Sequence, residues 1–250
     1  MNRLWELDAL RGTSLVLMLA FNWSVTLDYF QVFSVFQGSW LYWQLFPRLV
    51  AGAFLFIAGT SLSLSFDRFK ARNPGNWKPL LAGKYLKRGA GIFSLGLAVS
   101  LATWQFFPRE FVFFGILHLI GASIALSVPF LERRSLAVPA ALLFFALAPL
   151  LQGLPANDYF LASLGFGFSG ASLDYFPLVP WTGVVLLGLG LGGRALKLLE
   201  FKAVPGALER SFALLGRNSL MVYLLHQPLL LLLLLVVGVT GVRAVFGFPS

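Results

Sequence analysis

The sequence predicts an all-α membrane protein: a polytopic bundle of about seven transmembrane helices, forming a single integral membrane domain over residues 1–250. The hydrophobic and charged fractions of the chain predict this class. Hydrophobic residues make up 58% of the chain and charged residues only 12%, whereas soluble domains average about 45–50% and about 25%. The apolar residues also gather in long stretches. The chain has no cysteine, which excludes disulfides, thiolate catalysis and zinc–thiolate sites.

Each apolar stretch is long enough to cross the hydrocarbon core of a bilayer, which takes about 20 helical residues. The first has an acidic flank at Glu6 and Asp8, unlike a signal peptide. The fifth is the shortest and contains Pro139 and Pro149, which membrane helices tolerate where neighbours satisfy the freed carbonyls. In chain order the expected spans are 12–30, 41–66, 89–106, 111–131, 136–152, 175–193 and 218–241.

The Lys and Arg residues predict the orientation, because cytoplasmic loops carry the excess of these residues. With the N-terminus cytoplasmic and the C-terminus outside, the outer segments contain only Arg48, Arg109 and Arg243, and the other 16 of the 19 lie in inner segments. The net charge of +9 therefore fits a lipid bilayer as partner, in a cytoplasmic (inner) membrane, and gives no reason to expect nucleic acid binding.

Three connecting segments stand out. Segment 67–88 is basic and contains the turn signal Asn73–Asn76. Segment 153–174 has no Lys or Arg and is expected to be either a lid facing a substrate or an ordinary polar connection. Segment 194–217 has the pattern of an interfacial amphipathic helix, broken at Pro205-Gly206.

Strongly polar side chains are costly inside a membrane, so their positions are informative. In the first helix Arg11, Asn22 and Thr26 are expected to share one face, with Asp8 one turn before Arg11 and able to pair with it. This face predicts either a polar track that starts at the cytoplasmic end or an interfacial Asp–Arg pair with an asparagine that joins two helices.

Arg48 heads a face of the second span that continues through Gly52, Gly59 and Ser63. The small residues allow close helix packing. The arginine is expected either to meet a buried partner or an anionic ligand, or to reach toward the outer headgroups.

The chain has two histidines, His118 in the fourth span and His226 in the seventh, with Tyr223 and Gln227 close to the latter in sequence. Histidine is the usual side chain for proton transfer near neutral pH, although an interhelical hydrogen bond is the ordinary alternative for each. Neither helix carries a second histidine at i+4, and no acidic cluster accompanies them, so no metal site is expected.

The stretch Gly188–Gly193 matches G-x-G-x-x-G, which has meaning only between a strand and a helix. It lies inside an expected span, so close helix packing is the preferred interpretation.

Several blocks together resemble bacterial members of the heparan-α-glucosaminide N-acetyltransferase catalytic-domain family, a family of polytopic transmembrane acyltransferases. The blocks are Arg3–Gly12, Arg48 with Phe54–Gly59 and Ser61-Leu62, Gly115–Gly121, Asp174–Trp181 with Gly183, and Asn218–Leu220 with Tyr223 and His226–Pro228. In the stretch Gln37–Trp40 the chain has Gln37 where the resemblance implies a histidine, and Asn22 stands where many relatives carry one.

The resemblance implies transfer of an acyl group, expected to be acetyl, from cytoplasmic acetyl-CoA or another acyl-CoA to a glycan or small acceptor in the cell envelope. In this hypothesis His226 or His118 is the general base, and Asn22 stabilises the oxyanion. Arg11, paired with Asp8, holds the CoA phosphate. The acceptor site is assigned to Arg48, Trp181, Tyr223 and Gln227.

Two other hypotheses also fit the sequence. One is a small transporter or flippase for an anionic or lipid-linked metabolite, which the polar face of the first span also fits. The other is a non-catalytic membrane assembly partner. A homodimer is possible under any of the three hypotheses.

Overall fold

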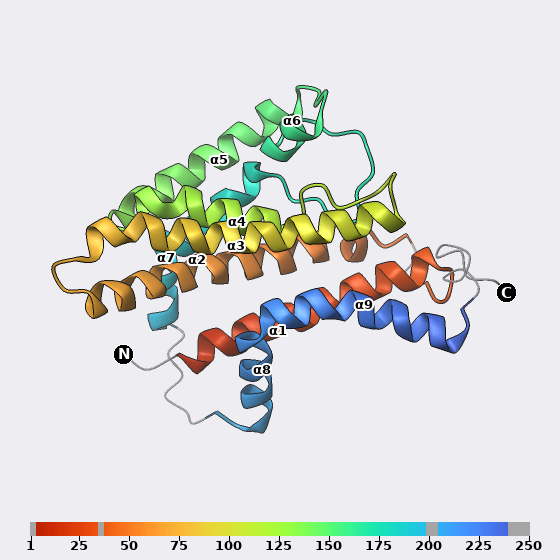
Figure 1. Ribbon diagram of the computed structural model, residues 1–250, viewed down its shortest axis with the longest axis horizontal. Coiled ribbons are helices and arrows are strands. Elements are labelled where there is room, and N and C mark those ends of the chain that lie inside the picture. The colour runs from red at the N-terminus through yellow and green to blue at the C-terminus, as the bar shows by residue number, and fades with distance from the viewer. Residues whose placement is uncertain (1–3, 35–37, 199–204, 240–250) are drawn as a thin grey trace. The chain divides into compact units, whose positions relative to one another are not determined.

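The computed structural model describes residues 4–34, 38–198 and 205–239, and these residues are almost entirely helical (Figure 1). The helices in chain order are α1 (Trp5–Tyr29), a π-helical turn η1 (Leu41–Leu45), α2 (Phe46–Arg72), α3 (Trp77–Phe106), α4 (Ile116–Ser127), the 3₁₀ turns η2 (Val128–Phe130) and η3 (Arg134–Leu136), α5 (Ala137–Gln152), α6 (Tyr159–Leu164), α7 (Leu178–Leu198), α8 (Ala207–Arg217) and α9 (Ser219–Val237).

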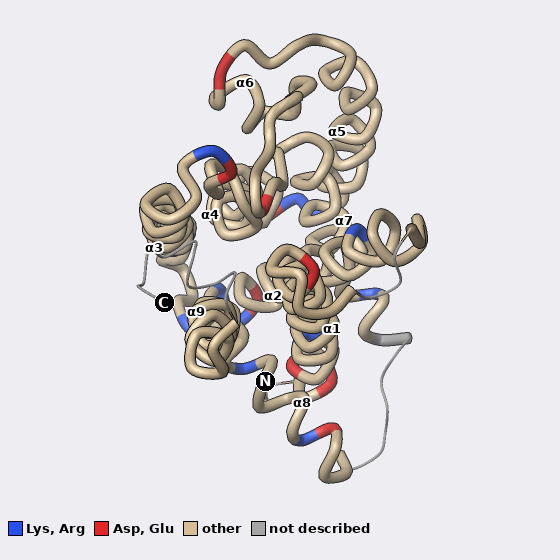
Figure 2. Tube along the Cα trace, turned by 90° about the vertical axis from the view of Figure 1, so that its right-hand side faces the viewer, with Lys and Arg blue, Asp and Glu red and all other residues tan. Residues whose placement is uncertain are grey.

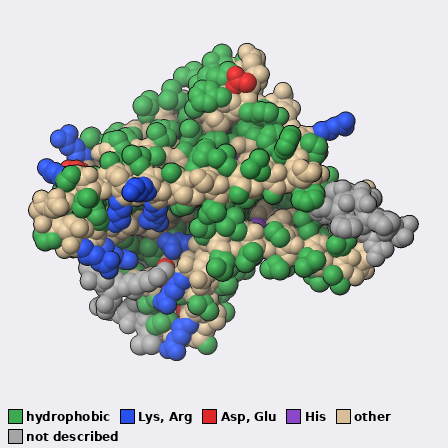
Figure 3. Space-filling view, viewed as in Figure 1, with side chains coloured by type: hydrophobic (Ala, Val, Ile, Leu, Met, Phe, Trp, Pro, Cys, Tyr) green, Lys and Arg blue, Asp and Glu red, His purple; other side chains and the backbone are tan. Residues whose placement is uncertain are grey.

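Six of these helices are long and apolar enough to cross a membrane, which confirms a polytopic membrane protein. They are Trp5–Tyr29, Leu41–Arg72, Trp77–Phe106, Arg134–Gln152, Leu178–Leu196 and Ser219–Val237. Helices α5 and α9 carry no charge along their length (Figure 2). Large apolar side chains stay exposed on them, for example Leu142 and Leu229, as expected for surfaces that face lipid (Figure 3).

The expected fourth span, 111–131, differs from the prediction because its helical part, Ile116–Phe130, is shorter than a full span. Residues 110–114 lie beside residues 172–176 in parallel direction: Leu173 N donates to Glu110 O at 2.8 Å and Phe176 N to Phe114 O at 3.0 Å. Hydropathy could not show this pairing, because a hydropathy pattern does not tell which segments lie side by side.

The chain divides into two compact units. Unit 1 comprises Met1–Phe54 and Glu200–Ser250, and unit 2 comprises Leu55–Leu199. The prediction of a single domain and the predicted orientation in the membrane stay predictions.

In unit 1, α1 crosses α8 with the two backbones in contact. A Cβ at Gly12 would lie 1.9 Å from Phe212 O, and one at Gly216 would lie 1.8 Å from Asp8 O, so both positions admit only glycine. Helix α9 packs on the far end of α1 through Phe30, Leu230 and Leu234.

In unit 2, glycines also set the packing of α7. A Cβ at Gly188 would lie 2.0 Å from Phe56 O, and one at Gly192 would lie 1.9 Å from the Thr60 hydroxyl, so α7 lies directly on α2. A Cβ at Gly190 would meet Val138, whereas Gly193 has nothing within 4 Å. Close packing therefore explains three of the four glycines in Gly188–Gly193.

Two connecting segments differ from their expected form. Helix α3 begins at Trp77, twelve residues before the expected span, because a helix tolerates the Lys and Arg residues that lower hydropathy there. Basic side chains gather where α2 turns into α3 (Figure 3). In the expected amphipathic segment 194–217, residues up to Leu198 continue α7 and the separate helix α8 begins after Pro205-Gly206, while residues 199–204 lie outside the described part.

Candidate functional site

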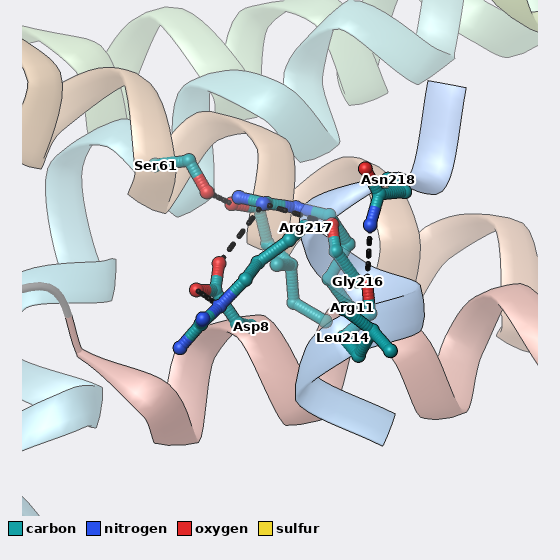
Figure 4. A network of polar contacts seen from close by, with 8 residues as sticks. Asp8, Arg11, Ser61, Leu214, Gly216, Arg217 and Asn218 are labelled. Carbon is teal, nitrogen blue, oxygen red and sulfur yellow. Dashed lines mark hydrogen bonds and ion pairs between the residues drawn. The ribbon is translucent and has the colours of Figure 1, made fainter. Parts of the chain in front are cut away.

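The expected anion-binding pair lies where α1 crosses α8. The Asp8 carboxylate is buried and receives Arg11 Nη1 at 3.4 Å on one oxygen and Arg217 Nε at 3.3 Å on the other. Arg11 Nη1 also donates to Gly216 O at 3.4 Å (Figure 4). The predicted Asp8–Arg11 pair is confirmed. Two guanidinium groups therefore meet at this one carboxylate.

Arg217 also belongs to this cluster, although nothing in the sequence singled it out as a candidate. Its partner Asp8 is 209 residues away, so no local spacing could show the pairing. The glycine pair Gly12 and Gly216 makes the pairing possible, because it lets the two helix backbones touch.

Thr26 and Gln227 join α1 to α9. Thr26 Oγ1 lies 3.0 Å from Asn22 O and donates to it, and Gln227 Nε2 lies 2.6 Å from Thr26 Oγ1. A hydroxyl has one proton, and this one is used on Asn22 O, so Thr26 must accept from the Gln227 amide. The amide nitrogen of Gln227 therefore faces Thr26. Its Oε1 is buried and receives no hydrogen bond from the residues described. Asn22 is half-buried on the same helix, one turn earlier.

His226 is buried in α9, with 6% of its surface exposed. Its Nδ1 lies 2.5 Å from Tyr223 O, and a carbonyl oxygen can only accept, so Nδ1 carries the proton. Nε2 is then unprotonated in the neutral ring. It is buried, and within the described ranges no group donates to it. The Tyr223 ring lies beside the imidazole, with the centroids 5.4 Å apart.

His118, in unit 2, has the opposite arrangement. Its Nδ1 accepts from Gly115 N at 3.2 Å, which caps the N-terminus of α4, so the proton lies on Nε2. Nε2 lies 3.3 Å from Ser100 Oγ, and Ser100 in turn donates to Val112 O. Gly96 leaves room for the ring, since a Cβ there would lie 2.9 Å from Nδ1. Both nitrogens of His118 therefore have partners in the fold.

Two of the sequence blocks that carry the family resemblance contact each other in the same part of unit 2. Asp174 Oδ2 accepts from Ile116 N at 3.0 Å, so the block Asp174–Trp181 caps the helix that begins the block Gly115–Gly121. Thr103 Oγ1 accepts from Val112 N at 3.0 Å, so α3 satisfies both backbone groups of Val112. Trp181 packs edge-on against Phe176, with the ring centroids 5.1 Å apart.

Beside this paired segment lies a cluster of aromatic rings from segment 153–174 and its neighbours: Phe111, Phe113, Tyr159, Phe168 and Tyr175. The Tyr175 hydroxyl donates to Ala162 O at 2.8 Å, and burial raises the pKa of this phenol above its usual value. Tyr175 lies before the span Leu178–Leu196.

Arg48 is exposed near the start of α2, and its Nη1 donates to Gln44 O of the preceding turn at 2.9 Å. Gln37 lies outside the described residues.

The structure thus brings Asp8, Arg11, Asn22, Tyr223, His226 and Gln227 into unit 1, which also holds Arg48, and places His118 and Trp181 in unit 2. Among the residues that the structure describes, no group of three or more His, Cys, Asp or Glu side chains could hold a metal ion.

Comparisons with known proteins identify the family. No curated protein and no solved structure matches the chain. The model of the family described as heparan-alpha-glucosaminide N-acetyltransferase, catalytic, matches residues 3–228, which include every candidate residue named above. The chain therefore belongs to the heparan-alpha-glucosaminide N-acetyltransferase catalytic family of transmembrane acetyltransferases.

Proposed function

We propose that this protein transfers an acetyl group from acetyl-CoA to an amine or hydroxyl of an envelope glycan or small acceptor, with His226 as general base. The observation that carries the proposal is the unprotonated, buried Nε2 of His226. The Tyr223 carbonyl fixes the tautomer and the ring orientation, which is how a backbone acceptor prepares a histidine for proton transfer.

His118 is the weaker candidate for the base. Its Nδ1 already accepts a backbone proton and its Nε2 proton is directed to Ser100, so neither nitrogen is available without opening the N-terminus of α4. We assign it a structural role.

The reaction needs one proton transfer. As the acceptor nitrogen or oxygen attacks the thioester carbon, His226 Nε2 takes its proton. The carbon–sulfur bond then breaks, and the CoA sulfur leaves and receives the proton back from His226. The products are the acetylated acceptor and CoA. Asn22, on α1 within one turn of Thr26, is the candidate donor for the oxyanion that forms on the thioester carbonyl.

The two guanidinium groups that Arg11 and Arg217 bring together at Asp8 support binding of the CoA phosphates there, because guanidinium groups bind phosphate with charge-assisted hydrogen bonds. Arg11 and Asn22 are eleven residues apart on α1, which is about 16 Å along a helix. A donor with its phosphates at one end and its thioester at the other end of a long arm fits such a separation. The predicted orientation puts Arg11 at the cytoplasmic end, where acyl-CoA is available.

The first test is release of CoA by the purified protein in nanodiscs with acetyl-CoA and glucosamine as acceptor. A thiol reagent reads CoA alone, because the protein has no cysteine. His226→Gln is expected to lower the rate about 100- to 10,000-fold. His118→Gln is the matched control and is expected to lower thermal stability while the rate per folded molecule stays within a few-fold of wild type.

Binding of the donor is tested separately by titration calorimetry with acetyl-CoA and with CoA. Saturable binding that Arg11→Gln abolishes in folded protein supports the donor site. Absence of donor binding, combined with uptake of an anionic or lipid-linked solute into liposomes, would replace this proposal with transport. Inactivity in both assays would favour a non-catalytic assembly partner.

A further inference from the structure

We infer that Gln227 Oε1 is a specificity-determining hydrogen-bond acceptor that requires a second donor on the acceptor substrate, and that Thr26 is the positioning residue that turns Oε1 toward it. The inference rests on the proposed function in one respect: it takes the ligand at His226 to be the acetyl acceptor.

The first step is the orientation of the Gln227 amide. With Nε2 toward Thr26, two hydrogen bonds form in series, from Gln227 to Thr26 and from Thr26 to Asn22 O. With the amide turned over, Thr26 could donate to only one of its two neighbours, and a buried NH₂ would be left without an acceptor. A buried donor or acceptor without a partner costs about 1–3 kcal/mol, so the first orientation is favoured.

The second step concerns the hydrogen-bonding character of the buried atoms that have no partner. Gln227 Oε1 and His226 Nε2 are both buried, and both can only accept; among the residues described, neither receives a hydrogen bond. Within the same residues only Arg68 Nε and Ser127 Oγ are also buried side-chain atoms without a hydrogen-bond partner, and both belong to unit 2. The two unsatisfied atoms of unit 1 are thus on consecutive residues and have the same hydrogen-bonding character.

The third step concerns the kind of ligand that can donate a hydrogen bond to both His226 Nε2 and Gln227 Oε1. Consecutive helical residues leave the axis about 100° apart with a rise of about 1.5 Å. The inference therefore takes one small molecule to lie between the two side chains and to contact both atoms. Such a molecule needs two donors: the group that His226 deprotonates and a second N–H or O–H beside it. A vicinal diol or an amino alcohol meets this requirement, and a monofunctional alcohol does not.

The test compares two neutral probes that differ only in the second donor, trans-1,2-cyclohexanediol and cyclohexanol. They are titrated without acyl donor into protein in nanodiscs labelled with ¹⁵N-histidine. The His226 Nε2 resonance, assigned with His226→Gln, reports binding of a donor to that atom, so partition of a probe into lipid does not interfere. Only two histidines contribute signals.

Wild type is expected to bind the diol at least about tenfold more tightly than the mono-alcohol, because the latter leaves Gln227 Oε1 unpaired. Gln227→Met is expected to bring this ratio close to one while the affinity for cyclohexanol stays within about twofold. Thr26→Val, which removes the hydroxyl at nearly constant volume, is expected to lower the ratio, and Thr26→Ser to restore it. Thr13→Val is the matched control: Thr13 is an exposed residue of the same helix, and its hydroxyl also bonds to the preceding turn, at Ala9 O.

The inference is overturned if folded wild type binds neither probe at His226, if it binds both equally, or if Gln227→Met keeps the preference. These outcomes are separate from failure of the proposed function. A preference for the diol in a protein that releases no CoA would leave the two-donor site standing and remove the acetyltransferase mechanism. Rapid acetylation by a protein without any preference for the diol would leave the acetyltransferase mechanism standing and remove the two-donor site.

Discussion

The side-chain amide of Gln227 donates to the Thr26 hydroxyl at 2.6 Å, across 201 residues of sequence. It ties α1 to α9, as the bond from Arg217 to Asp8 ties α1 to the residues of α8. The first link lies beside the candidate base and the second in the candidate anion site. Each link therefore holds α1 in register with the helix that completes the corresponding half of the proposed site.

The α1–α8 crossing is expected to depend on its two glycines. Gly12→Ala or Gly216→Ala places a methyl group within 2 Å of a backbone oxygen, so the helices must separate, at a cost of about 1–3 kcal/mol or more. Both variants should lower the thermal unfolding midpoint in nanodiscs and weaken acetyl-CoA binding, because Arg11 and Arg217 lose their common partner.

Gly91→Ala in α3 is the matched control, since a Cβ there meets nothing within 4 Å. Alanine is the better helix former, so this variant is expected to equal or exceed wild type in stability. Unchanged stability and donor affinity in Gly12→Ala would show that α8 does not rest on α1 in solution.

The sequence was sufficient for the membrane class, because hydropathy averages over a whole span and six of the seven expected spans are long helices. It could not predict where α4 begins, because a capping bond from Asp174, 58 residues away, and the pairing of two segments distant in the chain fix that point. It also could not predict where α3 begins, because a hydropathy pattern does not register the helix-forming tendency of lysine and arginine.

The candidate site was predictable in its residue types and not in their roles. Asp8 and Arg11 share a helix, so spacing alone predicted their ion pair. His118 and His226 look alike in sequence, each an isolated histidine in an apolar span. They differ because Nδ1 of the first meets a backbone N–H and Nδ1 of the second meets a backbone carbonyl, both three residues earlier.

Asp174 is expected to be structural. Asp174→Ala removes the oxygen that accepts from Ile116 N, and the loss of such a cap costs about 0.5–2 kcal/mol. Thermal unfolding should show this loss, with the acetylation rate per folded molecule within a few-fold of wild type. Asp174→Asn keeps an oxygen at the cap and should recover part of the stability. A large loss of rate at full stability would instead place Asp174 in the chemistry.

Tyr175 is expected to make stability fall at high pH. Burial raises its pKa, so folding favours the neutral phenol, which donates to Ala162 O. The contribution is complete below the pKa of the unfolded state, about 10, and is lost as the pH rises through the higher pKa of the folded state. Tyr175→Phe should be less stable than wild type at pH 8, and the difference should shrink above pH 10. A difference that stays constant to pH 11 would show that Tyr175 ionises alike in both states.

The two histidines are expected to be opposite tautomers. In the neutral rings, His226 carries its proton on Nδ1, facing Tyr223 O, and His118 carries its proton on Nε2, facing Ser100 Oγ. Two-bond ¹⁵N–¹H correlation spectra of histidine-labelled protein distinguish the tautomers, and His226→Gln assigns the rings. Ser100→Ala removes the acceptor for His118 and should shift only that ring, whereas the His226 pattern should stay as in wild type. An Nε2 proton on His226 would leave no unprotonated nitrogen facing the acceptor, and the assignment of His226 as the base would then fail.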